Sequence, residues 1–142
     1  MKRYFGLIYA PLCIALLLGG CLTQANQQDD AAKLAQQMHA AIQAQDLDTA
    51  LTLYSDDFFK SQSRDAWRDK LASLQERFGA LREIKSVFSQ KDPRFGGDFY
   101  IYGFKLMFER GAVNETLTIF KKNDEEQLMV TGQLFKFKDD VL

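Results

Sequence analysis

The feature that most constrains the fold is a change in hydrophobic period near residue 80. Apolar residues recur at helical spacing before this point and at alternating positions after it. A period of 3.6 residues indicates helices that bury one face, whereas a period of two indicates strands. Helices followed by consecutive strands predict an α+β fold, in which the helices pack on one face of an antiparallel sheet.

The first half of the chain contains three amphipathic segments with recognisable ends. The first begins at Asp29 or Asp30, and Asp46 and Ser63 begin the second and third. Asp and Ser at these positions accept hydrogen bonds from free N–H groups of the first helical turn. Gly79 ends the third helix, because glycine readily adopts a positive φ there. The apolar stripes of these helices comprise Leu34, Met38, Ala41 and Ile42, then Leu47, Ala50, Leu51 and Tyr54, then Trp67, Leu71, Leu74 and Phe78.

The second half of the chain predicts four strands joined by short turns, at residues 84–88, 99–109, 113–121 and 127–137. Both faces of strand 99–109 are largely apolar, so we expect this strand to be central and covered on both sides. Gly103 and Gly132 lie inside strands, where glycine indicates a bulge or a sharp bend. We therefore expect a strongly curved sheet.

The N-terminus has the pattern of a targeting segment. Lys2 and Arg3 precede an uncharged apolar run over residues 4–18, and Gly19 and Gly20 follow it. A helix needs about 20 apolar residues to cross the hydrocarbon core of a bilayer. The shorter run therefore favours a cleaved signal peptide over a retained anchor.

The residues Leu18-Gly19-Gly20-Cys21 resemble the lipobox of bacterial lipoproteins. This resemblance implies cleavage between Gly20 and Cys21, a diacylglycerol on the Cys21 sulfur, and an acyl chain such as palmitate on its new amino group. Leu22, rather than Asp, follows the cysteine, which implies sorting to the outer membrane with the domain facing the periplasm. The chain then divides into a signal peptide (1–20), a lipidated tether (21–28) and a folded domain (29–142).

Three stretches of the domain are similar to the nuclear transport factor 2-like fold, also called cystatin-like, and to small bacterial families of unknown function within it. They are AIQAQDLDTALTLYSDDF (41–58), DAWRDKLASLQERFGALREI (65–84) and EEQLMVTGQLFKF (125–137). The resemblance implies a cone between three helices and a strongly bent sheet. Enzymes of this fold hold a carboxylate base and a tyrosine acid in the cone, but their motif is not matched here, so no catalytic role is carried over.

A few side chains are weak catalytic candidates. Asp56 and Asp57 could share a proton, although such pairs more often cap helix ends. Glu115 shares a strand face with Val113 and Leu117, and it would line a pocket if that face were concave. Tyr54 lies at helical spacing from apolar residues, so it is interpreted as a core residue with its hydroxyl near the rim.

His39 is the single histidine of the chain. It could be a general base or a metal ligand, but we predict an exposed or rim histidine on an amphipathic helix. The domain offers no second His or Cys to complete a transition-metal set, so we expect no metal and no cofactor. The formal net charge is −1, and the chain lacks the basic surface that nucleic acid requires.

The sequence therefore predicts a non-catalytic outer-membrane lipoprotein. It would bind either a protein partner of an envelope assembly or an apolar small ligand in the cone, and it would form a homodimer through the sheet. The alternative is an isomerase-like or hydratase-like enzyme acting on a hydrophobic substrate. In that case Glu115, or the Asp56–Asp57 pair, would be the base and a tyrosine the acid.

Overall fold

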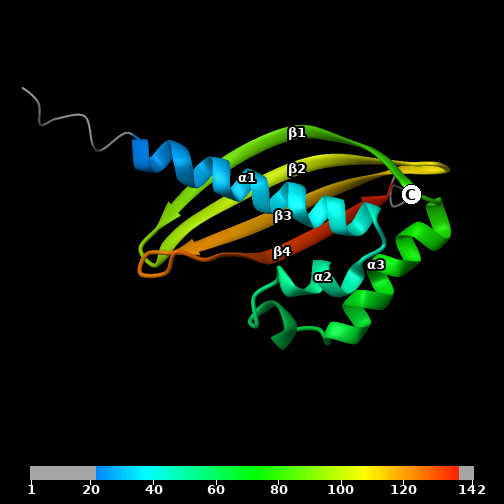
Figure 1. Cartoon of the computed structure of the whole chain (residues 1–142), viewed down its shortest axis with the longest axis horizontal. Coiled ribbons are helices and arrows are strands. Elements are labelled where there is room, and N and C mark those ends of the chain that lie inside the picture. Colours follow the sequence, from blue (N-terminus) through cyan, green and yellow to red (C-terminus); the bar gives the residue numbers. More distant parts are fainter. Residues whose placement is uncertain (1–21, 138–142) are drawn as a thin grey trace, which may run out of the picture.

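The computed structural model of the chain describes residues 22–137, so the predicted signal peptide (1–20) and Cys21 lie outside the described residues. Helices come first and strands follow, which confirms the predicted α+β class (Figure 1). The elements are α1 (Leu22–Gln43), α2 (Leu47–Thr52), the 3-10 helix η1 (Phe58–Lys60), α3 (Arg64–Phe78), β1 (Leu81–Arg94), β2 (Gly97–Phe108), β3 (Gly111–Lys122) and β4 (Leu128–Phe137).

The predicted starts of α2 and α3 and the predicted end of α3 are confirmed, whereas α2 ends at Thr52, earlier than predicted, because Tyr54 pairs with Val130 of β4 instead. The side chain of Asp46 accepts a hydrogen bond from the Thr49 N–H, and that of Ser63 accepts one from the Ala66 N–H. Gly79 follows α3 with a φ of +81°, as expected of a glycine C-cap.

The predicted start of α1 is wrong. The helix begins at Leu22 rather than at Asp29 or Asp30, so residues 22–28 are helical and do not form an extended tether. No glycine or proline interrupts LTQANQQ, and Leu, Ala and Gln are good helix formers that let the helix extend beyond the acidic pair. None of the helices within residues 22–137 is both long enough and apolar enough to cross a bilayer.

The four strands form one antiparallel sheet in chain order, β1-β2-β3-β4, with β1 and β4 at the edges. Both strand glycines lie at register shifts, as predicted. One shift falls between Ser86 and Phe88, opposite Gly103, and another between Thr118 and Ile119, opposite Gly132. β1 is longer than predicted because its pairing with β2 continues through Pro93, which an edge strand tolerates.

The helices pack on one face of the sheet, where α1 contacts both β1 and β4 (Figure 1). This face supplies the sheet's share of the core, namely Tyr100, Tyr102, Leu106, Phe108, Val113, Leu117, Ile119, Val130 and Phe135. We call the opposite side, with Ile101, Met107, Phe120 and Leu134, the open face. The prediction that strand 99–109 is central is confirmed, since β2 pairs with both β1 and β3. The predicted cover on its second side is wrong. Ile101 and Met107 are half-buried and Lys105 is exposed, because no described helix covers the open face.

An aromatic cluster holds α3 and the segment after α2 against the sheet. The buried Trp67 indole stacks on Phe135 of β4, with ring centroids 6.1 Å apart, and meets Phe58 at 5.1 Å. Tyr54 contacts the same Phe58 ring at 4.6 Å. The short helix η1 contains Phe58 and is separated from α2 by residues 53–57. Tyr54 is therefore fixed in place by packing on several sides.

The turn between β1 and β2 provides a matched pair of glycines for a stability test. We expect Gly97→Ala to lower the free energy of unfolding by about 1–3 kcal/mol. The reason is a φ of +153°, together with the fact that an added Cβ would lie only 2.2 Å from the Lys121 carbonyl oxygen. Gly96 has nothing within 4 Å of such a Cβ, so Gly96→Ala should be neutral or slightly stabilising. Urea denaturation of both variants measures the difference, and equal midpoints would contradict the assignment.

Candidate functional site

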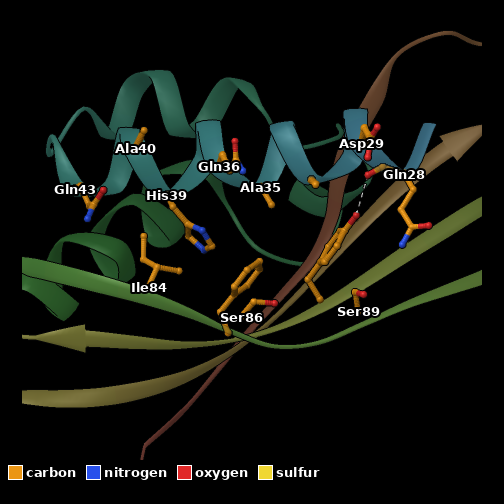
Figure 2. A pocket seen from close by; sticks show the side chains of 13 residues that line it. Gln28, Asp29, Ala35, Gln36, His39, Ala40, Gln43, Ile84, Ser86 and Ser89 are labelled. Atoms are coloured by element: carbon orange, nitrogen blue, oxygen red, sulfur yellow. Dashed lines mark hydrogen bonds between the residues drawn. The ribbon is translucent and has the colours of Figure 1, made fainter. Parts of the chain in front are cut away.

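A groove of about 600 Å³ lies between α1 and the first two strands (Figure 2). Its walls combine small or apolar side chains with polar ones, of which Asp29 is a carboxylate. The lining residues are Gln28, Asp29, Ala32, Ala35, Gln36, His39, Ala40 and Gln43 of α1, Ile84, Ser86 and Ser89 of β1, and Tyr102 and Phe104 of β2. A volume of this size is typical of a small-molecule site.

The helix wall of the groove follows from the spacing of α1. Gln28, Ala32, Gln36, His39 and Gln43 recur at steps of three or four residues, which places them on one stripe of the helix. From Gln28 to Gln43 this stripe extends about 22 Å along the axis. Figure 2 shows the labelled members of this stripe on the side of the helix that borders the groove. The groove is thus elongated and carries amide groups along its length.

His39 and Glu115 form a buried pair at the wall of this groove. The His39 Nε2 lies 2.5 Å from the Glu115 Oε2, and the two side chains are 5% and 0% exposed. The imidazole also meets the Phe104 ring edge-on, with centroids 4.6 Å apart and planes at 89°. The carboxylate thus sits behind the histidine and holds its ring in one orientation.

Two further side chains extend the pair into a chain of hydrogen bonds. The Gln133 Nε2 donates to the second carboxylate oxygen, Glu115 Oε1, and the Tyr54 hydroxyl donates to the Gln133 Oε1. Burial raises the pKa of the Tyr54 hydroxyl, which therefore stays protonated and serves as a donor. The connected order is Tyr54, Gln133, Glu115 and His39, from the aromatic cluster to the groove.

The prediction that His39 lies exposed at the rim of its helix is wrong, since the residue is only 4% exposed. The buried arc of α1 is wider than the apolar stripe because Glu115, 76 residues away in sequence, supplies a polar partner. The face assigned to Glu115 is confirmed, because Val113, Leu117 and the Glu115 side chain are all buried. Sequence reasoning missed Gln133 altogether.

The remaining candidates lie elsewhere. Asp56 and Asp57 are both exposed and do not line the groove. The Asp57 carboxylate is 2.5 Å from the Lys60 Nζ, and its hydrogen bond with that ammonium group lowers the pKa of Asp57.

Tyr102 does line the groove, and its hydroxyl donates to the Gln28 carbonyl oxygen at 3.3 Å. Within residues 22–137 no group of three His, Cys, Asp or Glu side chains could hold a metal ion.

The groove can bind a ligand, and His39 is the residue of the buried pair that could exchange a proton with it. Glu115 is enclosed and both of its oxygens are occupied, so His39 is the member of the pair that meets the groove. The other carboxylate of the lining, Asp29, lies ten residues away on the same helix, about 15 Å along the axis. The Asp29 carboxylate and the His39 imidazole are therefore too far apart along the helix to act as acid and base on one small substrate.

No protein-family model matches the chain, and no curated protein matches it either. Among solved structures, the chain is similar to the structure of Bdellovibrio bacteriovorus Bd1075, with a TM-score of 0.61 and 10% sequence identity. The match covers 85% of this chain and 44% of that one, so this chain spans less than half the length of the protein it resembles. At this identity the likeness concerns the fold alone: helices followed by an antiparallel sheet.

Proposed function

We propose that the chain is a lipid-anchored envelope protein whose domain binds an uncharged, partly apolar small molecule in the groove between α1 and the sheet. The observation that carries this proposal is the groove itself, with about 600 Å³ of space and a wall of Ala, Gln and aromatic side chains. Neither Lys nor Arg is among its described lining residues, so it has little to attract an anion.

Binding accounts for the geometry better than catalysis does. The enzyme alternative requires Glu115 or the Asp56–Asp57 pair to reach a substrate, but Glu115 is enclosed and the aspartates lie outside the groove. His39 could donate or accept one proton, but the Tyr102 hydroxyl of the lining already donates to the Gln28 carbonyl oxygen, and the Asp29 carboxylate lies about 15 Å from His39 along the helix axis. We therefore keep the non-catalytic role as the proposal.

A matched pair of tryptophan substitutions tests the groove. Gln36 and Gln37 are adjacent, exposed residues of α1, and only Gln36 lines the groove. We expect Gln36→Trp to weaken binding of an uncharged apolar dye such as Nile red at least about tenfold, because the indole occupies the ligand's space. Gln37→Trp should leave the affinity within about twofold. Fluorescence titration of the full chain measures both, and equal affinities in the two variants would contradict binding at this site.

The anchor in this proposal is Cys21, carrying diacylglycerol and an acyl chain, in the outer membrane. Because α1 begins at Leu22, directly after this cysteine, no flexible tether separates the lipid from the helix. Gln28, the first lining residue of the groove, would lie about 10 Å from Cys21 along a continuing helix. The groove would thus open close to the membrane surface, where partly apolar molecules concentrate.

We further propose that the domain belongs to the nuclear transport factor 2-like fold, with the groove at the mouth of its cone. The order of elements supports this proposal, as do the register shifts opposite Gly103 and Gly132, because such bulges bend a sheet.

Two copies are proposed to associate through the open face of the sheet. Leu134 is 50% exposed there, and Phe88, on the same face opposite Gly103, is 44% exposed. Ile101, Met107 and Phe120 are half-buried beside them. An apolar face of this kind favours a self-complementary contact in a symmetric dimer.

A further inference from the structure

The His39 Nε2 and both carboxylate oxygens of Glu115 have hydrogen-bond partners inside the protein. One carboxylate oxygen of Glu115 faces the His39 Nε2, and the other accepts a hydrogen bond from Gln133. Within residues 22–137, no Lys or Arg side chain forms an ion pair with Glu115; its partner there is His39. Any net charge on this pair would therefore remain buried without a compensating group.

The number of protons on the pair determines whether the outer ring nitrogen of His39, Nδ1, is protonated. A buried net charge is costly, because the lost solvation is not repaid by a partner. A carboxylic proton on the Glu115 Oε1 would face the Gln133 N–H donor, so the proton of this pair lies between Oε2 and the His39 Nε2. The pair then has two arrangements without net charge. In the first, an imidazolium donates from Nε2 to a carboxylate. In the second, a neutral imidazole accepts at Nε2 from a carboxylic acid. The other ring nitrogen, Nδ1, carries a proton in both arrangements.

We infer that the His39 Nδ1–H is a hydrogen-bond donor to ligands in the groove and selects those with an uncharged carbonyl oxygen, such as a secondary amide. This inference rests on the proposed binding function. The side chain lines the groove, its Nε2 is engaged by Glu115, and its Nδ1 makes no hydrogen bond within residues 22–137. Glu115 acts through the imidazole and is a positioning residue.

The rest of the lining explains why the carbonyl should be uncharged. Asp29 is a carboxylate of the same groove and neither Lys nor Arg is among its described lining residues, so a ligand carboxylate would lose its hydration without gaining a Lys or Arg partner. Gln36 and Gln43 flank His39 on the stripe (Figure 2) and can both donate to and accept from an amide. A chain with amide and apolar parts is therefore matched along the groove.

Nitrogen-15 NMR tests the proton directly. His39 is the only histidine of the chain, so ring-labelled histidine gives one pair of ring nitrogen signals without further assignment. We expect Nδ1 to be protonated in the full chain. We also expect it to stay protonated in Glu115→Gln, whose amide donates to Nε2 and so keeps the proton on Nδ1. A wild-type spectrum with Nε2 protonated and Nδ1 bare would overturn the inference, whether or not any ligand binds.

Two probes with the same alkyl chain test the selectivity. We expect N-hexylacetamide to shift the Nδ1 signal and to bind about tenfold more tightly than heptanoate, which carries the same hexyl chain, as a donor–carbonyl hydrogen bond allows. Equal or tighter binding of heptanoate would overturn the carbonyl preference while leaving the proposed binding function intact. If neither probe shifts the backbone amides of Gln36 and Gln43, the binding function itself fails, and the ligand part of this inference fails with it.

Discussion

Replacing His39 with leucine is expected to lower the free energy of unfolding by about 3–5 kcal/mol. The substitution places an apolar side chain of similar bulk against Phe104 and leaves the Glu115 Oε2 without its partner. Because the Glu115 side chain is 0% exposed, water cannot replace the lost hydrogen bond. Urea denaturation followed by circular dichroism measures the loss, and the exposed neighbour Gln37→Leu is the control, expected within about 0.5 kcal/mol of the wild type.

A second substitution distinguishes the cost of leaving the Glu115 carboxylate buried without a partner from the cost of lost packing around His39. Adding Glu115→Gln to His39→Leu should recover part of the loss, because the amide can still accept from Gln133 and no ionisable group is left stranded. If the double variant is less stable than His39→Leu alone, the pair is not the source of the effect. A His39→Leu variant as stable as the control would contradict a buried pair altogether.

The fold could be predicted largely because its signals are local. Asp46, Ser63 and Gly79 act on their own helix ends, so they are readable without knowledge of tertiary contacts. The glycines of the strands likewise predict bulges from their lack of a side chain. The start of α1 could not be predicted in this way, since Asp29 and Asp30 are competent caps but the helix also continues through helix-forming residues before them.

The site was harder to predict because it depends on distant partners. On the periodicity of its own helix, His39 is a polar residue at the edge of an apolar stripe, and exposure is the ordinary outcome. Its burial depends on Glu115 and Gln133, which come from β3 and β4. A polar residue on a face otherwise composed of Val113, Leu117 and Ile119 was the available signal for such a partner. The sequence placed Glu115 on that face but had no means of pairing it with His39.

The second large effect is expected from replacing Cys21, the proposed site of the lipid anchor. Replacing Cys21 with alanine should abolish lipidation and signal cleavage, because the thiol is the nucleophile that accepts the diacylglycerol. The chain has only two cysteines, Cys13 and Cys21, and Cys13 lies within the segment expected to be removed. We therefore expect the variant to accumulate as the full precursor, without bound palmitate and absent from the outer-membrane fraction. Mass spectrometry and labelling with radioactive palmitate measure both properties.

Cys13→Ala is the matched control, since it also removes one thiol but leaves the residues around the proposed cleavage site unchanged. It should be cleaved, lipidated and sorted like the wild type. A Cys21→Ala protein that appears at the mature mass would contradict the lipoprotein assignment, and so would a block caused by Cys13→Ala.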